Sequence, residues 1–355
     1  MKTLLRATNW VGDVVLSLPA LKALRASFPK DELTVLARPW VADLYRARPE
    51  PDDVLVEDPK GDHRGFAGIS RLAASLEERS FDRAVILPTS FGSAFTLLRA
   101  RIPERIGYRG ELRDFLLTRP ISSSLAVGEH QVWKHLRLVE AAGADLPESP
   151  DTSWKVERGL RDSARSRLRD AGWMGEPFLA AHAASFAHQA KRWLPERFAE
   201  LFDRLAGERG VAVALLGSAS EAAMNRSLAS ALRVARPFDL SGKTSLPEAL
   251  GLLAEAALFV GNDSGLAHLA AAAGTPTVVV FGPTDPDATR PWDGPRADGT
   301  PVNVRIVRSR PLCAPCRFTN CPIDHRCMAD VTVEQGWLAA SEVLRNVPSE
   351  NSKPM

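Results

Sequence analysis

Four short polar segments carry residue types suited to chemistry, and each follows a run of apolar residues. They contain Asp13, Lys191, Glu221 and the turn Gly261–Gly265, sequence GNDSG. An aspartate such as Asp13 can serve as a general base, although a helix cap is an equally ordinary role. A lysine can neutralise a phosphate as a compact point charge. A glutamate after a strand can accept hydrogen bonds from a ribose. These residues are therefore candidates for phosphate binding, ribose binding and proton transfer, and helix capping and solvated surface charge are the alternative roles.

The GNDSG turn predicts a strand, a turn, a short helix and a second strand. Residues 257–260 form the end of a buried strand, and Asp263 or Ser264 is expected to cap a helix over 266–273. Gly274 suits the left-handed residue that ends such a helix. Free backbone N–H groups and the helix dipole favour an anion at the helix start. A phosphate site is one interpretation, and an ordinary capped helix is the other.

The elements that position these residues alternate between strands and helices. Strands are predicted at 3–8, 33–37 and 83–88, and a second series runs through 177–183, 211–217 and 277–281. Such alternation predicts α/β units with parallel, doubly wound sheets. We place the domains at 1–155 and 176–332, with a linker region at 156–175, a C-terminal helix at 333–346 and a disordered tail at 347–355.

Length and composition narrow the class of protein. A chain of 355 residues exceeds one ordinary domain, and a net charge of +2 does not favour nucleic-acid binding. No run of eighteen apolar residues is present, and Arg6 and Asp13 interrupt any signal-peptide core, so we expect a cytoplasmic protein. The first strand is not followed by G-x-G-x-x-G, which is evidence against a dinucleotide-dependent dehydrogenase.

The four cysteines of the chain are confined to fifteen residues. Cys313, Cys316, Cys321 and Cys327 follow the pattern C-x2-C-x4-C-x5-C, with His325 among them. Four soft ligands at this spacing are compatible with a small structural zinc site. An iron–sulfur cluster, reduced thiols and reversible disulfides remain alternatives.

The order of the motifs along the chain resembles that of the ADP-heptose:lipopolysaccharide heptosyltransferases. The resemblance lies in WVGDVVLSLPAL, AKRW, GNDSGLAHLAAAAGTPTVVVFGPTDP and LCAPCRFTNCPIDHRCM. The NWVGD variant, residues 90–117 and the cysteine cluster look most like heptosyltransferase II, and the resemblance covers 1–346. It implies a GT-B architecture, with two Rossmann-like domains facing a central cleft. The N-terminal domain would bind the acceptor and the C-terminal domain the nucleotide sugar.

The resemblance also implies roles for individual residues. Asp13 matches the catalytic base, and Lys191 matches the lysine at the donor phosphates. The other expected donor-binding residues are Ser185, Glu221, Asp263, Ser264, Gly265 and His268. The implied reaction is an inverting transfer from ADP-heptose that requires no cofactor. One departure is the sequence Ala181–His182–Ala183–Ala184, where the family usually has a Pro-Gly-Ala-like turn.

The expected acceptor surface is basic. Between residues 83 and 137 there are nine Lys/Arg against four Asp/Glu, and Arg109, Arg113 and Lys134 are the candidate acceptor contacts. A phosphorylated heptosyl-Kdo2-lipid A would suit such a surface, as would peripheral contact with the cytoplasmic face of an anionic inner membrane. No nucleic-acid partner is expected. Two alternatives remain open, a related transferase with another acceptor or sugar nucleotide, and a nucleotide-sugar-binding protein without transfer activity.

Overall fold

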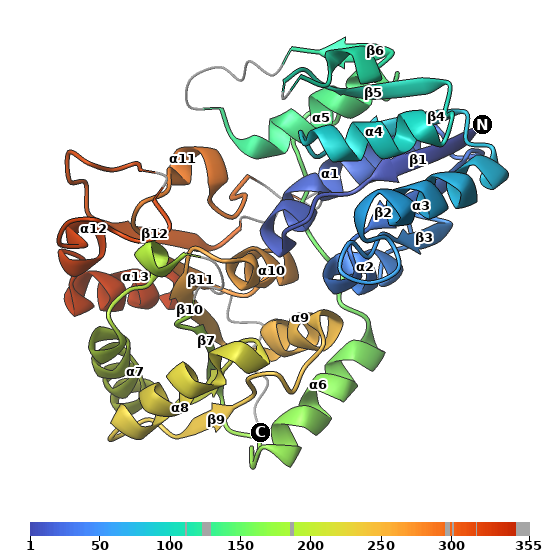
Figure 1. Ribbon diagram of the computed structural model, residues 1–355. Helices are drawn as coiled ribbons and strands as arrows, with labels where there is room; N and C mark the ends of the chain where they lie inside the picture. The colour runs from blue at the N-terminus through green and yellow to red at the C-terminus, as the bar shows by residue number, and fades with distance from the viewer. Residues whose placement is uncertain are drawn as a thin grey trace. The chain divides into compact units, whose positions relative to one another are not determined.

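The computed structural model describes residues 1–110, 112–122, 129–184, 188–294, 299, 302–316 and 318–345. Within it the chain divides into two compact units, 1–152 and 153–355. Each unit contains one parallel six-stranded sheet covered by helices (Figure 1). The prediction of two doubly wound α/β units is therefore confirmed.

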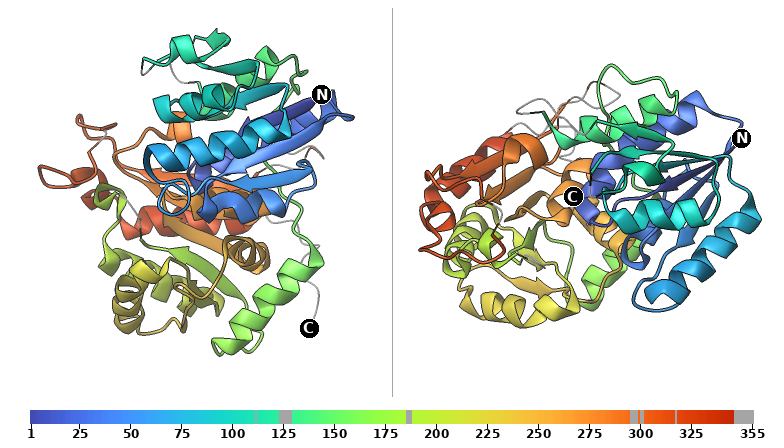
Figure 2. Two further views of the ribbon diagram at one scale, coloured as in Figure 1. Left: turned by 45° about the vertical axis from the view of Figure 1, so that its right-hand side comes forward. Right: turned by 45° about the horizontal axis from the view of Figure 1, so that its top comes forward.

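Unit 1 has the strand order β3-β2-β1-β4-β5-β6, and every pairing in it is parallel. Its strands are β1 (Lys2–Arg6), β2 (Glu32–Ala37), β3 (Asp53–Val56), β4 (Arg83–Ile86), β5 (Glu104–Tyr108) and β6 (Arg119–Ile121). Its helices are α1 (Val11–Ser27), α2 (Pro39–Arg46), α3 (Gly65–Arg79), α4 (Phe91–Arg99), the 3-10 turn η1 (Asp114–Leu116) and α5 (Gln131–Ala141). Helix α1 packs against α5 and contacts α2, and α3 packs against α4, so the helices cover the sheet in two groups (Figure 2).

Unit 2 repeats this plan with the order β12-β11-β10-β7-β8-β9. Its strands are β7 (Phe178–His182), β8 (Ala212–Leu215), β9 (Pro237–Asp239), β10 (Leu258–Asn262), β11 (Thr277–Phe281) and β12 (Val304–Arg308). Its helices are α6 (Arg158–Asp170), η2 (Gln189–Lys191), α7 (Pro195–Arg209), η3 (Ala219–Glu221), α8 (Ala222–Ala231), α9 (Leu246–Glu255), α10 (Gly265–Ala273), α11 (Pro286–Thr289), α12 (Arg326–Ala329) and α13 (Val333–Arg345). Strands β7, β10 and β11 are buried along their whole length, as the central strands of a covered parallel sheet must be.

The segment 156–175, expected to link the two series, instead contains helix α6 of unit 2. Helix α6 packs against α9, and Arg161 pairs with Glu255 at 2.8 Å. The crossing is close, because a Cβ placed on Gly251 would lie 2.4 Å from the carbonyl oxygen of Leu160. Glycine at this position therefore permits the contact. The unit boundary falls between Thr152 and Ser153.

Among the described helices, none combines the length and the apolar character needed to cross a bilayer.

Candidate nucleotide and acceptor sites

Polar side chains of unit 2 gather where its strands end. Since all strands of the sheet are parallel, the loops that follow them begin at one edge, which is where open α/β sheets bind ligands. The loops after β7, β8, β10 and β11 carry Lys191, Glu221, Asp263 and Thr284 respectively. Hydrogen bonds and ion pairs join these loops into one network.

Lys191 is held at this edge by a buried carboxylate. Its Nζ atom lies 2.6 Å from Oδ2 of Asp263, and the hydroxyl of Thr284 donates to the same oxygen at 2.7 Å. Asp263 is buried, whereas the side chain of Lys191 retains 23% of its exposure. An ammonium group has three donors, so pairing with Asp263 does not exhaust it. Asp263 thus positions a cation that an anionic ligand can reach.

Asn262 ties three segments of this edge together. Its side-chain amide donates to the carbonyl of Ala183 at 2.6 Å, and its Oδ1 accepts from the backbone N–H of Trp193 at 2.9 Å. The residue is fully buried. It fixes the path of the chain on both sides of Lys191. Sequence reasoning missed this role, although a buried Asn at the end of an apolar strand always needs hydrogen-bond partners.

His182 connects the start of α10 to Glu221. Its Nδ1 lies 3.0 Å from the hydroxyl of Ser264, and its Nε2 lies 3.6 Å from Oε1 of Glu221. The other carboxylate oxygen of Glu221 accepts from the N–H and hydroxyl of Ser218, at 2.7 and 2.8 Å. Burial of Glu221 disfavours its charge, but the interaction with nearby His182 and the hydrogen bonds from Ser218 outweigh that effect and lower its pKa to about 2. Glu221 is therefore an ionised capping and positioning group here.

The first turn of α10 is open to a ligand. Ser264 occupies the N-cap position, but its side chain makes no capping hydrogen bond to the helix. Ser264 and Gly265 are partly exposed, whereas His268 is buried one turn further along. Gly274 ends the helix in the left-handed conformation with φ of 92°, which confirms the prediction for that residue. Ser185, another predicted donor contact, lies outside the described residues.

Asp13 lies at the corresponding edge of the sheet in unit 1. Helix α1 starts at Val11 with Trp10 as its N-cap residue, so Asp13 falls in the first turn and does not occupy the cap position. The side-chain amide of Gln131, at the start of α5, donates to Oδ1 of Asp13 at 3.2 Å. This partner is 118 residues away in sequence and was not predicted. The contact orients the carboxylate.

The three predicted acceptor contacts differ in accessibility. Lys134 lies near Asp13: burial lowers its pKa, and the negative charge of Asp13 partly opposes that shift. Arg109 is exposed and pairs with Asp114 at 3.1 Å. Arg113 is completely buried, and its guanidinium donates to the backbone carbonyls of Tyr108 and Pro88 at 2.8 and 2.7 Å. An acceptor-binding role for Arg113 therefore needs correction, because the side chain instead holds two backbone segments together.

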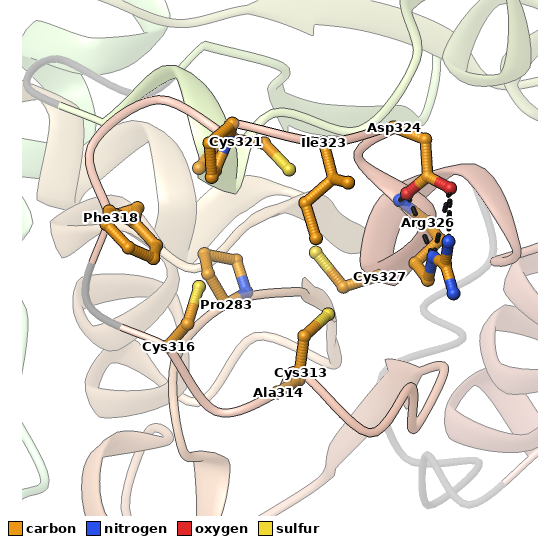
Figure 3. A pocket seen from close by; sticks show the side chains of 12 residues that line it. Pro283, Cys313, Ala314, Cys316, Phe318, Cys321, Ile323, Asp324, Arg326 and Cys327 are labelled. Atoms are coloured by element: carbon orange, nitrogen blue, oxygen red, sulfur yellow. Dashed lines mark hydrogen bonds and ion pairs between the residues drawn. The ribbon is translucent and has the colours of Figure 1, made fainter.

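The four cysteines surround one small cavity of about 60 Å³ (Figure 3). The loop that carries them is bonded to the donor edge, because Ala190 donates to the carbonyl of Thr319 at 2.9 Å and His325 contacts the carbonyl of Ala190 at 2.7 Å. Burial and the neighbouring cysteines raise the pKa of Cys327 to about 11. In the described part of the chain, no three His, Cys, Asp or Glu side chains are arranged to hold a metal ion.

These features define a class of protein. Two Rossmann-like units, one with a lysine and an open helix start at the ligand edge and the other with a carboxylate there, fit the GT-B class of glycosyltransferases. The chain belongs to glycosyltransferase family 9, whose model, described as Glycosyltransferase family 9 (heptosyltransferase), matches residues 69–325. The protein is thus a glycosyltransferase.

Individual relatives agree with this family. The chain is 33% identical to lipopolysaccharide heptosyltransferase 2 of Salmonella typhimurium over 303 residues, which cover 82% of this chain and 85% of that one. It is 28% identical to the solved Escherichia coli ADP-heptose LPS heptosyltransferase II, with a TM-score of 0.78 and coverage of 97% and 99%. A family 9 glycosyltransferase from Veillonella parvula shares the fold, with a TM-score of 0.84, 20% identity and 97% of each chain covered.

Proposed function

We propose that this glycosyltransferase transfers heptose from ADP-heptose to the inner core of lipopolysaccharide, adding the second heptose to heptosyl-Kdo2-lipid A. The observation that carries the proposal is the Lys191–Asp263 pair beside the open first turn of α10. This arrangement suits the diphosphate of a nucleotide sugar. Similarity to proteins named heptosyltransferase 2 supports the choice of sugar and acceptor.

The donor edge would act on the leaving group. As the bond between the anomeric carbon and the phosphate oxygen breaks, negative charge grows on the departing ADP. The ammonium of Lys191 and the N–H groups at Gly265 are fixed before the reaction, so they stabilise that charge without reorganisation. His182 holds the hydroxyl of Ser264 at the same place. Donor binding and leaving-group stabilisation would then share one set of residues.

Asp13 would act on the acceptor. Its carboxylate takes the proton of the acceptor hydroxyl while that oxygen forms the new bond to the anomeric carbon. A single displacement of ADP inverts the configuration at that carbon. Gln131 orients the carboxylate, and Lys134 and the exposed Arg109 supply positive charge for an acidic glycolipid. Peripheral contact with the membrane surface is part of the same proposal.

The cysteine loop would bind one structural zinc ion. Four thiolates are a preferred zinc donor set, and all four side chains line the same cavity. Binding requires the thiols to turn further inward, as expected where the metal itself completes the site. Metal analysis of protein purified without added metal should give about one zinc per chain, lost in Cys316→Ser/Cys321→Ser. Fully folded, metal-free protein would contradict the proposal.

The deciding experiment for the function is a transfer assay. Pure protein is incubated with ADP-heptose and, separately, Kdo2-lipid A and its monoheptosylated form, and product mass is followed. Product from the monoheptosylated acceptor alone is expected. If product forms from Kdo2-lipid A alone, the enzyme adds the first heptose and not the second, and ADP-heptose remains the donor. Failure to bind ADP-heptose would overturn the proposed donor site.

A further inference from the structure

The exposed large apolar side chains of unit 1 are concentrated at one edge of its sheet. Apart from Met1, those in the described part of the unit are Trp10, Trp40, Phe66, Phe91, Leu112 and Phe115. Each follows one of the strands β1 to β5, either in the connecting loop or in the first turn of the next element. Because the strands are parallel, these segments start from the carboxyl edge, the edge that also carries Asp13.

Four of these side chains form what we term the aromatic rim: Phe66, Phe91, Leu112 and Phe115. They are 65%, 40%, 88% and 74% exposed. The rings of Phe91 and Phe115 are in contact, with centroids 6.3 Å apart, and α3 packs against α4. Scattered apolar residues on a surface are normal, but several large ones at one edge of a sheet, two of them in contact, indicate an interaction surface.

Positive charge accompanies the aromatic rim. Lys60, Arg64, Arg71 and Arg99 are exposed, and none forms an ion pair with an acidic residue of the described chain. The guanidinium of Arg99 lies 5.1 Å from the centre of the Phe66 ring. Other exposed arginines of the unit are neutralised, as in the pairs Arg46–Asp43 and Arg101–Glu77. The segment 58–64 also contains Asp58 and Asp62, so lysine and arginine exceed aspartate by four to two in this group. Exposed apolar rings beside such an excess of cations are complementary to an anionic lipid surface.

We propose that the aromatic rim docks on an anionic bilayer, with its apolar side chains between the lipid head groups and the neighbouring cations at the lipid phosphates. Docking would bring the edge that carries Asp13 to a lipid-anchored acceptor. The inference rests on the proposed function for the acceptor, but membrane docking is measured independently of transfer. It also extends that function, because it adds shallow insertion of apolar side chains to the proposed peripheral contact with the membrane surface.

The binding test uses vesicles of phosphatidylcholine with and without phosphatidylglycerol. Wild-type protein should sediment with the anionic vesicles, and Phe66→Ser/Phe115→Ser should bind at least tenfold more weakly. The matched control is Met174→Ser/Leu338→Ser, which removes exposed apolar side chains of unit 2 and should bind like wild type. All substituted residues in the rim variant and in the control variant are exposed, and thermal melting checks that each variant is folded. Equal vesicle binding by the rim variant and wild type would overturn the proposal.

An activity test separates docking from catalysis. On acceptor embedded in vesicles the rim variant should lose at least tenfold in rate, and on a deacylated, water-soluble acceptor it should match wild type. Equal losses on both acceptors would overturn docking in favour of direct acceptor recognition. Sedimentation of the protein without vesicles gives a further test. If wild type is a dimer and the rim substitutions dissociate it, a second copy of the chain covers the aromatic rim and the docking proposal is overturned. If wild type transfers heptose to neither acceptor, the proposed function fails while vesicle binding still decides the docking.

Discussion

The two ligand edges of this molecule have the same backbone plan and different chemistry. The edge of unit 2 is held together by hydrogen bonds and an ion pair of buried polar groups, including Asn262, Asp263 and His182. The edge of unit 1 carries Asp13, held by Gln131, and exposed apolar side chains in the segments that follow its strands. Under the proposed function, the edge of unit 2 would bind a small, highly charged ligand and the edge of unit 1 a larger, amphipathic one.

The difference follows from what each proposed ligand requires. A diphosphate demands donors fixed in advance, because reorganising dipoles during the reaction would cost activation energy. A glycolipid contributes large apolar and anionic surfaces, which are bound over an area and not in a rigid cradle. The comparison implies that substitutions at the two edges should affect different kinetic quantities.

The largest expected effect is that of Asp13→Asn. Asparagine keeps the size of the side chain but cannot accept a proton, so kcat should fall by about 10²- to 10⁴-fold. The dissociation constant of ADP, measured by calorimetry, should stay within about twofold because Asp13 lies in the other unit. Asp43→Asn, at an exposed site on α2, serves as the control. If the Asp13→Asn enzyme remains fully active, Asp13 is not the general base and has only a structural role in the first turn of α1.

Lys191→Ala should produce the next largest effect, which is a loss of affinity for ADP. Hydrogen bonds to charged groups contribute about 1.5–3 kcal/mol, so ADP should bind roughly 10- to 150-fold more weakly. The variant also leaves the Asp263 carboxylate uncompensated beside the phosphates. Lys155→Ala, an exposed lysine of unit 2 that does not follow a strand of its sheet, should leave ADP binding unchanged. If Lys191→Ala binds ADP as tightly as wild type, the proposal that the edge of unit 2 binds the donor phosphates through Lys191 is wrong.

The third expected effect is on stability at pH 7, and it tests whether the edge of unit 2 is prearranged. Glu221 has a folded-state pKa of about 2, below the ordinary value, so its carboxylate stabilises the fold above the unfolded-state pKa near 4.5. Glu221→Gln should lower the free energy of unfolding at pH 7 by about 1.5–3 kcal/mol. That deficit should shrink as pH falls from about 4.5 towards 2. Urea unfolding across this range measures the deficit, with exposed Glu200→Gln as the control. A deficit that does not change with pH would contradict an ionised Glu221 carboxylate in the folded protein.

Much of the fold was predictable because local patterns report local structure. Continuous apolar runs identified β1, β2 and β4 of unit 1 and β7, β8, β10 and β11 of unit 2. Strands β3, β5, β6, β9 and β12 were not predicted. They are short or carry charged residues, as in the sequences RPI of β6 and PFD of β9, and only pairing with a neighbouring strand makes them part of a sheet.

By itself the sequence determined the α/β class, the motif order typical of the family, and the candidates Asp13, Lys191 and Asp263. The tertiary structure decided how side chains distant in sequence are used. It pairs Asp13 with Gln131 and Lys191 with Asp263, it buries Arg113, and it gathers apolar residues from separate loops into the aromatic rim. Periodicity and turn chemistry are properties of neighbouring residues. Burial and long-range pairing depend on the path of the whole chain, because parallel strands bring to one edge residues that the sequence keeps far apart.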